Sequence, residues 1–158
     1  PLLFRPVRIN DETLVKDFFY SLSDQSLQRR FMSSRRDVPH NVRQSFVVID
    51  YTHELVILAC VERDGIEIVA GIGQTITEKE THTAEVAFAV RDEYHGQGIG
   101  TELLSYLTML AQKDGLQGFT ADVLMENKPM LRVFEKMGFD MDMEIEQGAY
   151  HLTMRFTP

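Results

Sequence analysis

A glycine-rich turn is the part of this sequence whose residue types and spacing best suit binding chemistry. Gly96, Gly98 and Gly100 alternate at the start of a predicted helix, soon after the apolar segment 84–90. Without a Cβ at these positions, an anion can approach the backbone closely. The free N–H groups and the dipole of a helix N-terminus favour a phosphate or pyrophosphate. Three glycines at alternate positions are more than a tight turn requires, so the segment predicts phosphate binding.

Known phosphate-binding motifs narrow the choice of ligand. A dinucleotide-binding fingerprint needs a small residue where this sequence has Thr101 or Leu103, so neither register fits. The sequence has no Gly-Lys-Ser/Thr to complete a nucleoside-triphosphate loop. It also has no HExxH motif and no Cys/His spacing typical of a metal site, and we therefore expect no metal. Cys60, the single cysteine, cannot form an internal disulfide.

The turn resembles the acyl-CoA-binding motif of the GNAT superfamily of N-acyltransferases, Gln/Arg-x-x-Gly-x-Gly/Ala. In this chain the motif reads His95-Gly96-Gln97-Gly98-Ile99-Gly100, with His95 where Gln or Arg is usual. Segments 126–130 and 135–139 resemble the second signature of the family. More narrowly, the chain is similar to the acetyltransferase domain of bacterial protein lysine acetyltransferases in segments 21–23, 30–31 and 123–130.

The resemblance implies which parts of the chain hold the acyl donor, acetyl-CoA. The backbone N–H groups of residues 95–101 are expected to bind the CoA pyrophosphate, and segment 88–90 to pair with the pantetheine arm like a neighbouring strand. The sheet is expected to splay there, so that the N–H of Ala89 or Val90 polarises the thioester carbonyl. The expected cofactor-binding residues are Phe88, Ala89, Val90, His95, Gly96, Gln97, Gly98, Ile99, Gly100, Thr101, Asn127 and Met130.

Glu85 is the expected general base. An amine must lose a proton before it attacks a thioester, and the reference pKa of a lysine ammonium is about 10.4. Glu85 is the one ionisable residue of segment 84–90, the resemblance places the catalytic Glu on this strand, and we expect partial burial to raise its pKa. Asp122 and Glu126 are the alternative bases. Phe134 stands where many relatives have the Tyr that protonates the thiolate, so no general acid is assigned.

Hydrophobic periodicity predicts the elements that position these residues. Helices are expected after an N-cap at Asn10 and over 24–31, with Asn127 capping a later helix. The dipeptide Asp64-Gly65 predicts a tight hairpin turn. The remaining predicted elements are strands at 4–9, 55–61, 66–76, 84–90, 120–125, 139–146 and 150–156, helices at 98–112 and 127–137, and a short helical piece at 39–48.

This element order predicts an α/β (α+β) layered domain that occupies residues 1–158 as a single unit. Its resemblance to the GNAT fold implies a central mixed, mostly antiparallel sheet of about seven strands. About four helices are expected to flank the sheet, which splays at the acyl-CoA site.

The uneven distribution of charge along the chain indicates which classes of partner the protein is expected to bind. Residues 1–50 hold 8 Lys/Arg and 6 Asp/Glu, a charge of +2, while residues 51–158 hold 8 and 18, a charge of −10, which together give −8. An acidic chain disfavours binding to nucleic acid and to anionic membranes.

No membrane span and no secretory signal are recognisable in the sequence, so we expect a cytoplasmic location. Arg29, Arg30, Arg35 and Arg36 form a basic cluster, and the acidic stripe 140–146 is expected to face solvent, or else to attract a lysine-rich partner.

The sequence therefore predicts an acetyl-CoA-dependent N-acetyltransferase in which a primary amine attacks the thioester directly. The resemblance favours the ε-amine of a protein lysine as acceptor, for example on an acyl-CoA synthetase. A small free amine, such as a polyamine or an amino acid, is the first alternative. A noncatalytic domain that binds acyl-CoA to regulate a partner is the second. The sequence leaves open whether the chain is a monomer or a dimer.

Overall fold

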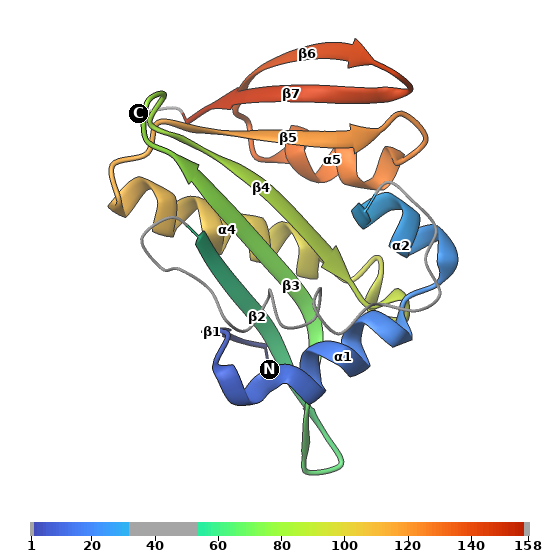
Figure 1. The fold of residues 1–158 in the computed structure, drawn as a ribbon. Coiled ribbons are helices and arrows are strands. Elements are labelled where there is room, and N and C mark those ends of the chain that lie inside the picture. Colours follow the sequence, from blue (N-terminus) through green and yellow to red (C-terminus); the bar gives the residue numbers. More distant parts are fainter. Residues whose placement is uncertain (1, 32–53, 157–158) are drawn as a thin grey trace.

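A seven-stranded sheet forms the centre of the structure, a computed structural model that describes residues 2–31 and 54–156 (Figure 1). The strand order is β1-β2-β3-β4-β5-β7-β6. β4 and β5 are parallel, and all other neighbouring strands are antiparallel, which confirms the predicted mixed, mostly antiparallel sheet. The strands are β1 (Leu3–Pro6), β2 (Glu54–Arg63), β3 (Ile66–Glu78), β4 (Thr83–Val90), β5 (Gly118–Leu124), β6 (Asp140–Glu146) and β7 (Ala149–Arg155).

Helices cover both faces of the sheet. α1 (Glu12–Ser21) and α2 (Asp24–Phe31) lie on one face, and α4 (Ile99–Lys113) and α5 (Lys128–Lys136) lie on the other (Figure 1). Two short 3-10 turns, η1 (Ile9–Asp11) and η2 (Asp92–Tyr94), precede α1 and the glycine-rich turn. These four helices confirm the prediction for the described residues, whereas the helical piece predicted at 39–48 lies outside them.

Each helical layer buries its own apolar core. The core under α1 includes Phe18 and Phe19, and the core under α4 and α5 includes Leu103, Leu107 and Phe134. Burying a side chain of this size contributes about 1.5–3 kcal/mol. The packing fixes the start of α4 beside the end of β4.

Gly73 of β3 allows α4 to approach the sheet closely. A Cβ at this position would lie 2.7 Å from Cδ1 of Leu107, so the buried Leu107 side chain would have to shift. The glycine therefore sets the distance between α4 and β3 and, through it, the position of the turn that precedes α4.

The sheet splays between β4 and β5. Their pairing extends only from Thr83 opposite Gly118 to Glu85 opposite Thr120. Beyond this point β4 continues along β3 to Val90, and β5 continues along β7, so the two strands diverge (Figure 1). The predicted splay is therefore present, and Glu85 stands at its apex.

The beginning of the chain differs from the prediction in two respects. The first strand ends at Pro6 rather than at residue 9, and Asp11 rather than Asn10 is the N-cap of α1. The reason is the carboxylate of Asp11, which accepts two hydrogen bonds from the Arg5 guanidinium, at 2.8 and 2.9 Å, and one from the backbone N–H of Arg8 at 2.7 Å. These bonds fold 9–11 into the η1 turn before the helix begins.

The predicted turns and helix ends agree with the structure. Asp64 and Gly65 have φ values of 53° and 78°, as a tight hairpin between twisted strands requires. Gly115 and Gly138, which follow α4 and α5, have φ values of 80° and 72° and end their helices. The boundaries of the other described elements shift by at most two residues because helix and strand ends are set by local hydrogen bonds.

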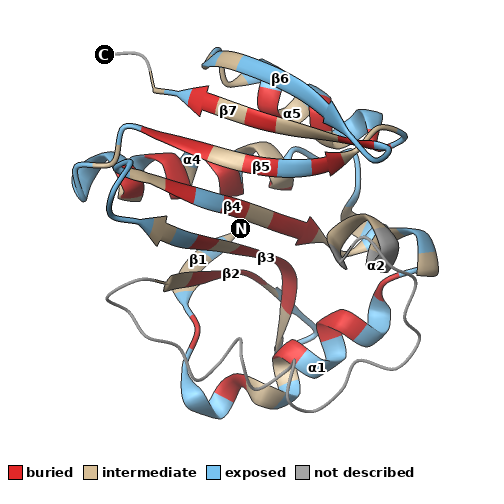
Figure 2. Cartoon of the chain, turned by 45° about the horizontal axis from the view of Figure 1, so that its top comes forward, coloured by how far each residue is buried: buried red, intermediate tan, exposed pale blue. Residues whose placement is uncertain are grey.

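The α1/α2 side of β5, β7 and β6 has no covering helix within the described residues, and β6 is largely exposed (Figure 2). Asp140, Asp142, Glu144 and Glu146 are exposed, which confirms the predicted solvent face. Arg155 bridges to Asp140 and Asp142 at 3.0 and 3.1 Å. Of the helices in the described ranges, none has the length and apolar character needed to cross a bilayer.

Candidate functional site

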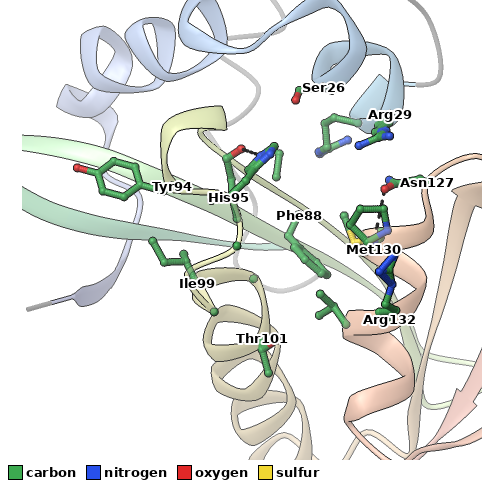
Figure 3. Close-up of a pocket in the computed structure, with 18 of the residues that line it drawn as sticks. Ser26, Arg29, Phe88, Tyr94, His95, Ile99, Thr101, Asn127, Met130 and Arg132 are labelled. Carbon is green, nitrogen blue, oxygen red and sulfur yellow. Dashed lines mark hydrogen bonds between the residues drawn. The ribbon is translucent and has the colours of Figure 1, made fainter.

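A cavity of about 480 Å³ lies between α2, the glycine-rich turn and α5 (Figure 3). All of the predicted cofactor-binding residues line it except Gln97. Gln97 is exposed, and its side-chain amide donates to the backbone carbonyl of Glu93 at 3.3 Å. The cavity thus brings together segment 88–90, the turn and the start of α5, which are distant in sequence.

The glycine-rich turn forms one end of the cavity. Gly96 and Gly98 have φ values of 78° and 84°, in the left-handed region that L side chains rarely adopt. Gly98 is the N-cap of α4 and has no side chain to accept the first free N–H groups of the helix. The N–H groups of Ile99, Gly100 and Thr101 therefore have no acceptor within the helix and lie at the cavity wall. This arrangement suits a phosphate.

The charge of the cavity lining is opposite to that of the chain. Within the described residues, the lining contains four cationic side chains and no carboxylate, although the chain carries a net charge of −8. The cations are Arg29, Arg30, Arg132 and Lys136. Such a lining attracts a polyanion. Within 2–31 and 54–156, no three or more His, Cys, Asp or Glu side chains are grouped so as to hold a metal ion.

Sequence reasoning missed Arg132 and Lys136 as cavity residues. A signal was available, because positions 129, 132, 133 and 136 have the spacing of one face of a helix, and all four line the cavity. Arg29 and Arg30 were recognised as a basic cluster but not as part of this site. Their position depends on how α2 lies over the sheet, which no local pattern indicates.

The edge of β4 offers backbone groups to the cavity. Arg91 donates its N–H to the carbonyl of Ala70 at 2.8 Å. Because amide directions alternate along a strand, the N–H of Ala89 points to β3 and that of Val90 points into the splay. Of the two expected donors, the geometry therefore favours Val90. The Val90 carbonyl lies 2.7 Å from Nε2 of His95 and accepts its hydrogen bond (Figure 3).

Asn127 and Phe134 form the α5 side of the site. Asn127 is 4% exposed and caps α5, its side-chain oxygen accepting from the N–H of Met130 at 3.4 Å, as predicted. Phe134 packs against Phe88 with 5.6 Å between the ring centroids and lines a second, smaller cavity between β4 and β5. Its phenyl ring has no proton to donate.

The structure corrects one expectation for Glu85. The side chain is exposed rather than partly buried, and it lines neither of the two cavities. Arg30 lies on the same side of the sheet. Burial lowers the pKa of Arg30 to about 10, while the Glu85 carboxylate acts in the opposite direction. Arg30 also donates to the side-chain oxygen of Gln74 at 2.9 Å.

The two alternative bases differ in their surroundings. Asp122 lines the smaller cavity but is engaged by His151, whose Nδ1 lies 2.8 Å from its carboxylate. This hydrogen bond raises the pKa of His151, against the effect of burial. Glu126 is exposed before α5 and lines neither of these cavities.

Comparison with known proteins agrees with this geometry. The model of the Acetyltransferase (GNAT) family matches residues 17–139. The chain is 33% identical over 141 residues to Acetyltransferase Pat of Mycolicibacterium smegmatis, which covers 85% of this chain and 40% of that protein. It is 25% identical over 138 residues to Acetyltransferase PA5475 of Pseudomonas aeruginosa, covering 87% of this chain and 74% of that protein.

Solved structures show the same fold. The GNAT domain of S. lividans PAT superposes with a TM-score of 0.86 at 24% identity, over 97% of this chain and 89% of that chain. The predicted α/β GNAT fold is thereby confirmed. Because the family model spans most of the sequence, from residue 17 to residue 139, the chain belongs to the acetyltransferase (GNAT) family, whose members use acetyl-CoA.

Proposed function

We propose that this chain transfers an acetyl group from acetyl-CoA to the ε-amine of a protein lysine, with an acyl-CoA synthetase as the class of protein substrate. Two findings support the lysine acceptor. One is the likeness to Acetyltransferase Pat of M. smegmatis, at 33% identity over 85% of this chain. The other is the similarity of segments 21–23, 30–31 and 123–130 to bacterial protein lysine acetyltransferases.

The residues of the cavity fit acetyl-CoA. The free N–H groups at the start of α4 would hold the pyrophosphate, with Arg132 and Lys136 of α5 supplying positive charge beside it. The outward-facing edge of β4 would pair with the amides of the pantetheine arm, and Asn127 would contact the arm from the opposite wall. Bound acetyl-CoA supplies an activated acyl group, and the chain supplies its position and a base.

One observation carries the catalytic part of the proposal. Glu85 is the last residue of β4 that pairs with β5, so its carboxylate stands where the two strands separate. In this role Glu85 accepts a proton from the attacking amine, which must be neutral to attack a carbonyl carbon. Its exposure leaves it accessible to a lysine presented on the surface of another protein.

Two further groups complete the mechanism. The N–H of Val90 points into the splay and would donate to the thioester oxygen as negative charge develops there. Phe134 cannot protonate the departing thiolate, so no side chain is assigned as general acid. The net charge of −8 favours the approach of a cationic, lysine-rich segment through long-range attraction.

A competition experiment tests this function. The protein and acetyl-CoA are incubated with a purified acyl-CoA synthetase and free polyamines, and mass spectrometry maps every new acetyl group. We expect site-specific acetylation of a synthetase lysine. Acetylated polyamine alone would assign the chain to small-amine modification. Bound acetyl-CoA without any acetylation would support the regulatory alternative instead.

Two variants show which carboxylate acts as the general base in this experiment. Glu85→Gln removes the proposed base at nearly constant volume and is expected to abolish the acetylation. Asp122→Asn removes the carboxylate held by His151 and is expected to leave most of the acetylation in place. Loss of acetylation in Asp122→Asn with retention in Glu85→Gln would transfer the role of base to Asp122.

A further inference from the structure

α2 is fixed over the cavity at both of its ends. At its start, the backbone N–H of Ser23 and the hydroxyl of Ser26 donate to the two carboxylate oxygens of Asp92, each at 3.2 Å. Burial opposes but does not cancel the effect of these hydrogen bonds, which lower the pKa of Asp92. Towards its end, Arg30 donates to Gln74 of β3 at 2.9 Å. The helix is therefore anchored both to the η2 turn and to the sheet.

Arg29 is one of three side chains of this helix that line the site, together with Ser26 and Arg30 (Figure 3). It lines both the large cavity and the smaller cavity between β4 and β5. Its Nε is buried, and within the described part of the chain no group accepts a hydrogen bond from it or forms an ion pair with Arg29. A guanidinium stays charged, and leaving a buried donor unsatisfied costs about 1–3 kcal/mol. The position calls for an anionic acceptor on the ligand.

The two neighbouring arginines differ in this respect. Arg30 already faces Glu85 and bonds to Gln74. Arg29 has no such partner among the residues that the structure describes, so of these two arginines it is the one available to a ligand. In Figure 3 it lies on the α2 side of the cavity, above Asn127.

The position of Arg29 does not suit the phosphates of CoA. All of these belong to the nucleotide part of the molecule, which the glycine-rich turn, Arg132 and Lys136 would hold at the other end. The pantetheine arm and an acetyl group are neutral. An acyl chain that ends in a carboxylate would place a negative charge at the end of the cavity where Arg29 lies.

We infer that Arg29 recognises a carboxylate at the end of the acyl chain, so that dicarboxylic acyl-CoA donors such as succinyl-CoA bind more tightly than acetyl-CoA. The inference rests on the proposal that the cavity binds acyl-CoA. The transfer step is unchanged: Glu85 takes the first proton of the ammonium, and the neutral nitrogen then forms a bond to the thioester carbon. The carbon–sulfur bond breaks, its electron pair leaves with CoA as the thiolate, and the thiolate takes the second proton that the nitrogen loses. The terminal carboxylate takes no part in bond exchange.

Calorimetry without any amine tests the inference on the full chain. CoA, acetyl-CoA and succinyl-CoA are titrated into the wild-type protein and into Arg29→Met. We expect succinyl-CoA to bind the wild type about tenfold more tightly than acetyl-CoA, the scale of one hydrogen bond to a charged group. Arg29→Met should remove this preference, and Arg29→Lys should retain part of it. Circular dichroism establishes that each variant is folded.

A matched control separates the two ends of the cavity. Arg132→Met removes a cation beside the phosphates and is expected to weaken the binding of all three ligands alike, with the ratio unchanged. Equal affinity of the wild type for acetyl-CoA and succinyl-CoA would overturn the inference, as would a preference that survives in Arg29→Met. Failure of CoA and of both acyl-CoA donors to bind would instead overturn the proposed function.

A second arm distinguishes the other source of a carboxylate, the acceptor. Lysine and cadaverine differ only in the carboxylate of lysine, so both are compared as acceptors with acetyl-CoA. We expect Arg29→Met to leave the ratio of their KM values unchanged. A rise in KM for lysine alone would assign Arg29 to the acceptor and contradict the inference about the donor.

Discussion

The two ends of the cavity are built in different ways. The end at the start of α4 is made of the glycine-rich turn, where the backbone N–H groups of Ile99, Gly100 and Thr101 have no acceptor within the helix. The opposite end is made of side chains and a strand edge from α2, β4 and α5, and residues of β5 line the smaller cavity. Backbone groups present a rigid, general anion site, whereas converging side chains present charge and shape specific to one reaction. We propose from this difference that the first end binds the nucleotide and that the second determines the chemistry.

If the two ends have these roles, substitutions at the start of α4 should alter the affinity for acetyl-CoA, and substitutions at the opposite end should alter turnover or selectivity.

Among the proposed substitutions, the one at Glu85 has the largest expected effect on turnover. Glu85→Gln should lower kcat about 100-fold or more, the usual contribution of a positioned base, while the Kd for acetyl-CoA stays within about twofold. Thiol release measured at saturating amine gives the first quantity, and calorimetry gives the second.

The control for this variant is Glu144→Gln, an exposed carboxylate on β6. It should leave both quantities unchanged. Full turnover in Glu85→Gln would remove Glu85 from the mechanism, and a large loss of acetyl-CoA affinity would break the division between the two ends.

Gly98 gives the largest expected effect at the backbone end. A Cβ at a φ of 84° costs about 1–2 kcal/mol and alters the turn that presents the N–H groups. Gly98→Ala should therefore raise the Kd for acetyl-CoA about tenfold, with kcat at saturation close to that of the wild type. Gly65→Ala is a matched control, because Gly65 has a φ of 78° but lies in the hairpin between β2 and β3.

Both alanine variants should lower the melting temperature by a few degrees, about 2–4 °C per kcal/mol for a chain of this size. Of these two variants, only Gly98→Ala should weaken the binding of acetyl-CoA. A similar Kd in the two variants would mean that the turn does not hold the ligand.

The same contrast explains which features could be predicted from the sequence. The glycine-rich turn and the Asn127 cap are local patterns, and the structure has both. The exposure of Glu85 and the position of Arg29 depend on how α2 and the sheet approach each other, which residues distant in sequence decide. The N-cap at Asp11 was missed for a related reason, because its partner Arg5 lies in the preceding strand.

A substitution of His95, which lies between the two ends of the cavity, should have a smaller effect on acetyl-CoA affinity. Its hydrogen bond occupies the Val90 carbonyl, which lies at the strand edge where the pantetheine arm is expected to pair. His95→Ala should free that carbonyl and tighten acetyl-CoA binding up to about fivefold, the scale of one neutral hydrogen bond. Weaker binding would indicate that the His95 side chain contacts the ligand directly.

The smallest effect concerns His151 and folding stability. The Asp122 hydrogen bond raises the pKa of His151 above its unfolded value of 6.5. A raised histidine pKa stabilises the fold fully below the unfolded pKa and loses this effect as pH rises through the folded pKa. His151→Gln should therefore lower the melting temperature more at pH 5.5 than at pH 8.5. The loss of melting temperature should be small, because the His151–Asp122 pair is half-exposed and solvent screens it. An equal loss of melting temperature at both pH values would contradict an ionic role for His151.

Hydrogen exchange with and without acetyl-CoA tests the central claim most directly. The N–H groups that begin α4 have no acceptor in the helix, so in the free protein they should exchange quickly. We predict that acetyl-CoA slows exchange at residues 95–101 and at the β4 edge from 88 to 90, with a weaker effect at the start of α5. Binding of acetyl-CoA without protection of residues 95–101, or with protection confined to other parts of the chain, would contradict the account.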